Sequence, residues 1–198
     1  MRRYQAVLIA VTALVLAGIV AFVLYGNNRP GGSGTALVGG PFTLVDQDGE
    51  TRTEKDFAGS YMLIYFGYTF CPDVCPTALQ VMSHAMDRVK PEIAEKVTPV
   101  FITIDPERDT VAQLKSYVGN FHPRLVGLTG TPEQIARAAK AYRVYYGRAR
   151  GDESSTEYLM DHSSVVFLMG PDGAYLTHFT HQTPPDKMAE ALTAYVGG

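Results

Sequence analysis

The chain has 198 residues, a formal net charge of −3 at pH 7, 46% hydrophobic residues and 19% charged residues. This length suits one domain with short additional segments, and the hydrophobic content is sufficient for a packed core. The slight acidic excess argues against a general nucleic-acid-binding protein, which carries a strong basic excess. We therefore expect no nucleic-acid partner.

The N-terminal segment starts with Arg2 and Arg3 and continues as an uncharged, mostly apolar run over residues 6–25. A helix needs about 20 apolar residues to cross a bilayer, whereas the apolar region of a signal peptide has about 7–15. No convincing A-x-A cleavage site ends the run. Residues 1–25 therefore predict a retained transmembrane anchor, with a cleaved signal peptide as the alternative. The two arginines place the remainder of the chain outside the cytoplasm.

The next segment, residues 26–40, is rich in Gly, Asn, Pro and Ser and is typical of a flexible linker. The domain is expected over residues 41–198. Two of its segments, 61–68 and 97–104, are continuous apolar runs, as in strands that are buried on both faces. In chain order the patterns predict a strand at 42–46, a strand at 61–68, a helix at 76–89, a strand at 97–104, a helix at 110–118, a strand at 125–128, a helix at 131–142, strands at 163–169 and 174–180, and a helix at 185–196.

This alternation of strands and helices predicts an α/β domain in which helices cover both faces of a central mixed sheet. The turn sequence at residues 171–173 (Pro-Asp-Gly) joins the last two strands as a hairpin. A strand–helix–strand start, a terminal hairpin and a final helix resemble the thioredoxin-like fold. A fold alone does not define a function.

Both cysteines lie between the first buried strand and its helix, with the spacing C-x-x-x-C. Pro76 suits the first helical position, which would make Cys75 the helix cap and leave Cys71 in the loop. The positive end of a helix dipole stabilises thiolates, and two soft thiolates favour Cu(I) or Zn. A structural disulfide is the alternative in an exported domain. Closing so short a loop removes little chain entropy, which favours a metal-binding or redox dithiol.

A third ligand is expected from one of five histidines. His162 lies just before the strand predicted at 163–169, at the place where thioredoxins hold a cis-proline facing the cysteines. We expect its imidazole to face the two sulfurs, with Asp161 as a carboxylate that orients the ring. The others are expected to be ordinary surface or hydrogen-bonded histidines: His84, His122, His178 and His181.

Four stretches resemble the Sco/SenC family of copper-binding proteins, and the resemblance covers residues 39–198. They are residues 40–44 (GPFTL), 66–76 (FGYTFCPDVCP), 104–110 (IDPERDT) and 161–163 (DHS). The resemblance implies copper, Cu(I) or Cu(II), held by Cys71, Cys75 and His162. It also implies a role in cytochrome c oxidase assembly, either as a metallochaperone that delivers copper to the CuA centre of subunit II or as a reductase of that subunit's cysteines.

In an oxidising compartment Cys71 and Cys75 can close into a redox-active disulfide, which must be reduced before Cu(I) binds. A separate periplasmic thioredoxin-like reductant is expected to do this. The implied location is the cytoplasmic (inner) membrane, with a single span and the domain in the periplasm. A mitochondrial inner membrane is the alternative for a eukaryotic source, but no Arg- and Ser-rich transit region precedes the apolar run, which favours the bacterial case. Asp105 is expected near the same rim. It either tunes the electrostatics of the site or contacts a partner, or else it forms a local cap or turn with Arg108 and Thr110.

Three functions thus remain to be separated. A metallochaperone binds copper without turnover, and a thiol–disulfide reductase attacks a target disulfide. Two features favour metal binding. One is the extra residue between the two cysteines, and the other is the histidine at the position where thioredoxins hold a cis-proline. A peroxiredoxin-like peroxidase fits poorly, because such enzymes use a single peroxidatic cysteine after a Thr/Pro-rich segment.

Overall fold

The computed structural model describes residues 4–5, 38–149, 158–180 and 182–197. The chain separates into two units, Met1–Ala36 and Leu37–Gly198, and all elements below belong to the second. Among the described residues, no helix is both long and apolar enough to span a bilayer. The anchor expected over residues 1–25, apart from positions 4 and 5, lies outside the described residues, as does the linker up to residue 37.

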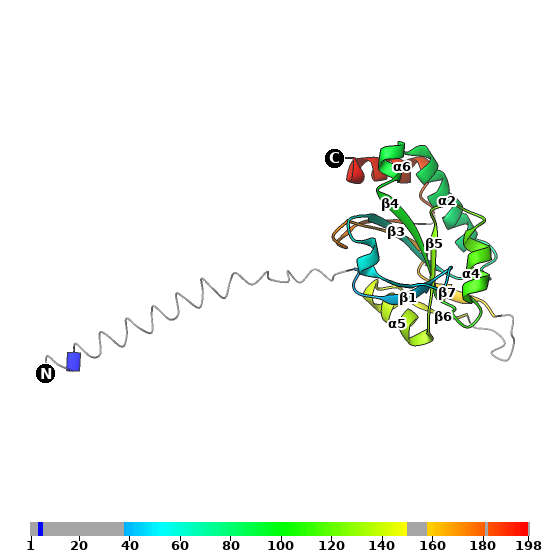
Figure 1. The fold of residues 1–198 in the computed structure, drawn as a ribbon, viewed down its shortest axis with the longest axis horizontal. Helices are drawn as coiled ribbons and strands as arrows, with labels where there is room; N and C mark the ends of the chain where they lie inside the picture. Colours follow the sequence, from blue (N-terminus) through cyan, green and yellow to red (C-terminus); the bar gives the residue numbers. More distant parts are fainter. Residues whose placement is uncertain (1–3, 6–37, 150–157, 181, 198) are drawn as a thin grey trace. The chain divides into compact units, whose positions relative to one another are not determined.

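Seven strands form a mixed sheet in the order β2-β1-β5-β4-β3-β8-β9 (Figure 1). The central pairs β3–β4 and β4–β5 are parallel, and the outer pairs are antiparallel. The continuous apolar runs form β3 and β4, as expected for strands covered on both faces. The bounds are β1 (Thr43–Asp46), β2 (Thr51–Thr53), β3 (Tyr61–Gly67), β4 (Val97–Thr103), β5 (Val126–Thr129), β8 (Val165–Met169) and β9 (Tyr175–Thr180).

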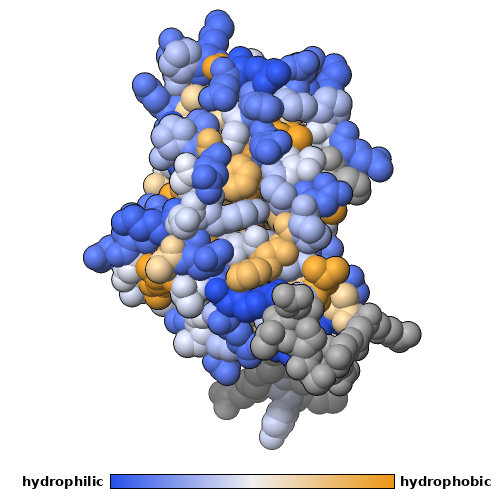
Figure 2. All heavy atoms as spheres, turned by 90° about the vertical axis from the view of Figure 1, so that its right-hand side faces the viewer, coloured by the Kyte–Doolittle hydropathy of each residue, from blue (hydrophilic) through white to orange (hydrophobic). Residues whose placement is uncertain are grey.

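Helices cover both faces of this sheet. On one face α2 (Val74–Arg88) packs against β3 and α6 (Pro185–Val196), and α4 (Val111–Val118) packs on β5. On the other face α5 (Pro132–Ala141) packs on β1. The remaining helical elements are a 3-10 turn, η1 (Glu54–Phe57), and α3 (Pro91–Ala94). The face bearing α4 shows hydrophobic residues as separate spots among hydrophilic ones (Figure 2), as on an ordinary soluble surface.

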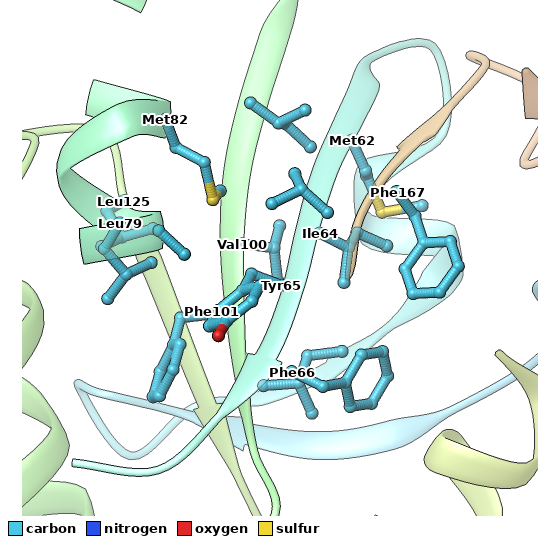
Figure 3. Close-up of a cluster of buried hydrophobic side chains, with 14 of the residues drawn as sticks. Met62, Ile64, Tyr65, Phe66, Leu79, Met82, Val100, Phe101, Leu125 and Phe167 are labelled. Atoms are coloured by element: carbon cyan, nitrogen blue, oxygen red, sulfur yellow. The ribbon is translucent and has the colours of Figure 1, made fainter. Parts of the chain in front are cut away.

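The core lies on both sides of β3, because successive strand residues point to opposite faces. Figure 3 shows Tyr65 beside Leu79 and Phe101 on one side, with Phe66 and Phe167 on the other. All five side chains are buried. The alternation also directs Gly67, the last residue of β3, toward α2, since it shares the face of Tyr65. The sheet therefore ends directly beneath the cysteine segment.

The structure confirms the expected strand–helix order and corrects three local predictions. Helix α2 begins at Val74, so Cys75 lies in its first turn and Asp73, not Cys75, is the cap. The helix start predicted from Pro76 was therefore too late. A two-stranded sheet that the patterns did not predict forms from β6 (Tyr146–Arg148) and β7 (Met160–His162). His162 is consequently the last residue of a strand.

Candidate metal centre

The cysteine segment connects the carboxyl end of β3 to the start of α2. Cys71 lies in the connecting loop and is half-buried, whereas Cys75 lies in the first helical turn and is fully buried. The Asp73 side chain makes no capping hydrogen bond. Instead, the amide of Cys75 donates to the Sγ of Cys71 at 3.4 Å. The Cys71 sulfur therefore accepts one of the backbone donors that a helix start leaves free.

His162 reaches this pair from the far end of β7. Its Nε2 lies 3.4 Å from the Sγ of Cys75, and its Nδ1 lies 3.3 Å from the carbonyl of Ser163. The tautomer with its proton on Nδ1 donates to that carbonyl and leaves the lone pair of Nε2 facing the sulfurs. The ligand atoms of Cys71, Cys75 and His162 all lie within 4.8 Å of one another, which is close enough for one metal ion.

The two thiols have opposite shifts in pKa. The hydrogen bond from Cys75 is the largest influence on Cys71, and together with contacts to His162 and backbone amides it lowers the pKa of Cys71 far below that of an ordinary thiol. The same hydrogen bond between the two thiols, together with burial, raises the pKa of Cys75. The opposite directions favour loss of the first proton of the pair from the more exposed sulfur. Both cysteines are free thiols in the structure.

Aromatic side chains form the walls around the imidazole. The rings of Tyr65 and Tyr68 meet the ring of His162 edge-on, with centroid distances of 6.0 and 6.1 Å. Burial, followed by the neighbouring Cys75, raises the pKa of Tyr65, and its hydroxyl has no hydrogen-bond partner among the described residues. The Tyr68 hydroxyl accepts the amide of Met160 at 3.2 Å. Tyr68 thereby ties β7 to the end of β3.

A groove of about 280 Å³ opens from the cysteines and the histidine to solvent. One wall is the cysteine loop with the start of α2, and the other is β7 with its flanking residues. Two of its lining residues are acidic, Asp73 and Asp161. The lining residues are Tyr68, Cys71, Pro72, Asp73, Val74, Ala149, Leu159, Met160, Asp161, His162 and Ser164.

Asp109 positions the cysteine loop, although the sequence patterns did not single it out. It is fully buried and accepts hydrogen bonds from the amide and hydroxyl of Thr69, at 3.0 and 2.6 Å, and from the hydroxyl of Thr103 at 2.6 Å. Burial raises its pKa, although these hydrogen bonds oppose the shift. Because Thr69 lies two residues before Cys71, Asp109 links the loop after β4 to the loop that bears the sulfur.

Asp105 lies one contact further from the sulfurs than expected. It is buried and binds the Nε of Arg108 at 2.5 Å and the hydroxyl of Tyr158 at 2.6 Å. The Arg108 guanidinium in turn lies over the rings of Tyr158, Phe70 and Tyr68, at 3.6, 4.8 and 5.8 Å. Asp105 thus contacts Arg108, which packs against the aromatic side chains on either side of Thr69, Tyr68 and Phe70.

Asp161 also differs from its expected place. It lies in the middle of β7 with its side chain exposed. Successive strand residues point to opposite faces, so Asp161 and His162 diverge. The group that contacts Nδ1 of His162 is the Ser163 carbonyl rather than the Asp161 carboxylate. In the described part of the chain, the group of metal-ligand residues includes none of the other histidines, and His181 lies outside that part.

The fold and the site together define a thioredoxin-like domain in which two cysteines and a histidine converge at the end of the sheet. Residues 30–197 match the family described as SCO1/SenC. The chain therefore belongs to the SCO1/SenC family, as the motifs indicated.

Individual relatives agree with this membership. The human mitochondrial protein described as SCO1 homolog is 43% identical over 164 residues, which cover 82% of this chain and 54% of the relative. The chain thus spans about half of that protein. ScoI of Bradyrhizobium japonicum, solved with copper bound, is 42% identical with a TM-score of 0.72, covering 80% of this chain and 99% of that structure. BsSco, described as a Sco family member with a disulfide switch, is 25% identical with a TM-score of 0.63, covering 80% and 92%.

Proposed function

We propose that this chain is a copper metallochaperone that binds one copper ion through Cys71, Cys75 and His162 and delivers it to the CuA centre of cytochrome c oxidase. The observation that carries this proposal is the convergence of the three ligand atoms within 4.8 Å, although 87 residues separate Cys75 from His162. Copper itself is the cargo.

The ligand chemistry supports copper over harder ions. Two sulfurs and an imidazole nitrogen are soft or borderline ligands, which suit Cu(I). No carboxylate belongs to the group of three. The copper-bound ScoI of B. japonicum provides a relative with this cargo, and BsSco is described as a member of a family of cytochrome c oxidase assembly proteins.

The three ligands have different tasks in this proposal. Fully buried Cys75 forms the inner side of the site, and half-buried His162 places its Nε2 3.4 Å from the Cys75 sulfur. Half-buried Cys71 faces the groove, and its thiolate is preformed. An incoming ligand from a partner can therefore replace Cys71 first, so that copper moves by stepwise ligand exchange without any change of oxidation state. The buried thiol of Cys75 loses its proton when the ion binds.

Residues 1–25 anchor the chain in the cytoplasmic (inner) membrane, residues 26–40 are the linker, and residues 41–198 lie in the periplasm. The apolar run at 6–25 and the preceding arginines support this arrangement. The recipient is cytochrome c oxidase subunit II. A periplasmic thioredoxin-like protein reduces a disulfide between Cys71 and Cys75 before copper is loaded.

The test is a titration of the reduced full chain, kept in mild detergent, with Cu(I) against a competing chelator. We expect one copper per chain, and a large loss of affinity in Cys71→Ser, Cys75→Ser and His162→Ala. His84→Ala is the matched control, because His84 is exposed on α2 and should leave affinity unchanged. Full affinity in His162→Ala would contradict the proposed ligand set.

A thiol–disulfide reductase of the oxidase cysteines is the second candidate, and the opposite pKa shifts of the two thiols favour it. The Cys71 thiolate would attack one sulfur of a target disulfide and release the other as a thiolate. Cys75, after losing its proton, would then attack the Cys71 sulfur of the mixed disulfide and release the second target sulfur as a thiolate. The target gains two electrons, and Cys71 and Cys75 become a disulfide.

The two candidates differ in their dependence on His162. A reductase requires only the cysteines, so His162→Ala should still reduce a model disulfide peptide at a rate near that of the unaltered chain. A chaperone requires the histidine for retention of copper. If the full chain transfers electrons but does not retain copper at any tested concentration, the reductase proposal replaces the chaperone proposal.

A further inference from the structure

The hairpin of β6 and β7 has a defined pattern of hydrogen bonds. The amide of Ala149 donates to the carbonyl of Leu159 at 2.9 Å, and the amide of Ser163 donates to the carbonyl of Tyr145 at 3.0 Å. In an antiparallel pair, hydrogen-bonded and non-hydrogen-bonded residue pairs alternate. The pair Gly147–Asp161 is therefore hydrogen-bonded. The pairs Arg148–Met160 and Tyr146–His162 direct their backbone groups away from each other.

The outward backbone groups of β7 face the cysteine loop. This direction follows from the amide of Met160, which donates to the hydroxyl of Tyr68 at the end of β3. The carbonyl of Met160 and both backbone groups of His162 lie along the same edge. Within the part of the chain that the structure describes, β7 pairs only with β6, so no strand occupies this edge. A free edge of this kind can accept an extended peptide as an additional strand.

The charge and shape of the groove beside this edge restrict the ligand. Asp73 and Asp161 line opposite walls, and both are exposed. Neither forms an ion pair in the described residues, and the groove lining contains no lysine or arginine. Leu159, which is 53% exposed, adds an apolar side chain to the β7 wall. A complementary segment is extended, has basic residues and places a small apolar residue near Leu159.

We propose that an extended, basic segment of a partner protein binds the edge of β7 as an added strand, paired with the carbonyl of Met160 and both backbone groups of His162, while the Met160 amide keeps its bond to Tyr68. The inference rests on the proposed function, because the edge has a purpose only if a partner must approach the three ligands. Main-chain pairing gives affinity, and the alternate side chains of the added strand that face the groove can carry an acceptor ligand toward Cys71.

The first experiment follows the His162 amide by NMR in the reduced, metal-free full chain in detergent. The probe is the synthetic peptide Lys-Thr-Val-Thr-Ser-Val-Thr-Val-Lys, whose central serine cannot exchange disulfides and is a poor copper ligand. Saturating peptide should slow hydrogen exchange at the His162 amide at least about tenfold. The Asp161 amide is the internal control, because its pairing with Gly147 already protects it. No peptide binding, or binding without slower exchange at His162, would overturn the proposal.

Two N-methylated peptides separate strand pairing from contacts of side chains. Both keep the sequence of the first peptide, but methyl groups replace the amide hydrogens of the odd-numbered residues in one and of the even-numbered residues in the other. Loss of two main-chain hydrogen bonds should weaken binding about tenfold in the register that pairs with β7. If both methylated peptides bind as tightly as the first, the peptide does not add to the strand, and the proposal fails.

Charge provides a third readout. Asp161→Asn and Asp73→Asn should each weaken the lysine-flanked peptide about two- to fivefold at low salt, with a smaller effect at high salt. Asp172→Asn, in the turn between β8 and β9, is the matched control and should have no effect. Equal affinities in all variants would contradict the basic character assigned to the partner.

The copper titration of the same preparation distinguishes the two proposals. Peptide pairing without copper retention would leave the edge as a docking site and remove the chaperone function. Copper retention without peptide pairing would keep the metal site and overturn the docking proposal.

Discussion

The Sγ of Cys71 accepts a hydrogen bond from the amide of Cys75, with a distance of 3.4 Å between nitrogen and sulfur. The loop thus supplies the acceptor that the Asp73 cap does not, and the helix start stabilises negative charge on that sulfur. This bond adds to the larger effect of the hydrogen bond between the two thiols, so that the thiols are unequal before any metal or partner arrives.

The unequal thiols predict selective alkylation of the reduced, metal-free chain. Cys71 should react with iodoacetamide as a thiolate well below pH 7, whereas an ordinary thiol has a pKa of about 8.5. Cys75 should react slowly, because it is buried and its pKa is raised. Mass spectrometry of quenched samples over a pH series measures both rates. Cys75→Ala should move the pH dependence of Cys71 alkylation to higher pH, because the hydrogen bond from the Cys75 thiol is the largest influence on the pKa of Cys71.

The same shift predicts a pH dependence of stability. A lowered pKa contributes stability that is present above the unfolded-state pKa and is lost as pH falls through the folded-state pKa. The free energy of unfolding of the reduced chain should therefore exceed that of Cys71→Ser by an amount that grows as pH rises toward about 8.5. Denaturant melts at several pH values provide the measurement. A constant difference would show that the Cys71 thiolate is not preferred in the folded state.

Asp109 is predicted to stabilise both the fold and the cysteine loop. Asp109→Ala leaves Thr69 and Thr103 without their buried acceptor and should lower the free energy of unfolding by about 2–3 kcal/mol. Cu(I) affinity should fall as well. Asp109→Asn keeps an acceptor and should retain most of both. The exposed Asp87→Ala is the matched control in denaturant melts and chelator competition.

The raised pKa of Asp109 predicts a pH dependence opposite to that of an ordinary paired carboxylate. Because burial raises its pKa, its contribution to stability is present at low pH and is lost as pH rises through the raised value. The stability of Asp109→Asn relative to the unaltered chain should therefore improve as pH rises above the ordinary carboxyl range. The opposite trend would indicate that hydrogen bonds to Asp109 outweigh its desolvation.

Tyr68→Phe is predicted to loosen β7 from the end of β3. The change removes the acceptor of the Met160 amide and should cost about 1 kcal/mol of stability. Copper should dissociate faster, because His162 lies on the loosened strand. Tyr61→Phe is the control, since its hydroxyl bonds the Tyr195 carbonyl on α6, away from the groove. Unchanged dissociation in Tyr68→Phe would show that β7 is held by other contacts.

Gly67→Ala tests the close approach of the sheet to the sulfur. A Cβ at Gly67 would lie 2.9 Å from the Sγ of Cys75 and 3.0 Å from the Phe101 ring. The clash should lower stability by about 1–3 kcal/mol and displace Cys75, which weakens Cu(I) binding. Gly147→Ala is a matched strand control, because the nearest atom there lies at 3.5 Å. Equal effects of the two changes would contradict a steric role for Gly67.

The sequence by itself determined the elements whose signals are local. Continuous apolar runs specified β3 and β4, the turn at residues 171–173 specified the β8–β9 hairpin, and Thr131 followed by Pro132 specified the start of α5. These signals act within a few residues, so pattern and propensity suffice to detect them. The family motifs supplied the cysteine pair and the histidine as a set.

The tertiary structure decided how the parts of the site meet. The start of α2 moved from Pro76 to Val74, because a proline is tolerated anywhere in the first turn and does not define its first residue. The hairpin of β6 and β7 carries no strong alternation, and its position depends on contacts such as that of Tyr68 with Met160. The Ser163 carbonyl, and not the expected Asp161 carboxylate, contacts Nδ1 of His162, and Asp109 accepts the amide of Thr69. Both contacts depend on groups that converge only after folding. Contacts between residues far apart in the chain are set by packing of the whole sheet, and no local pattern encodes them.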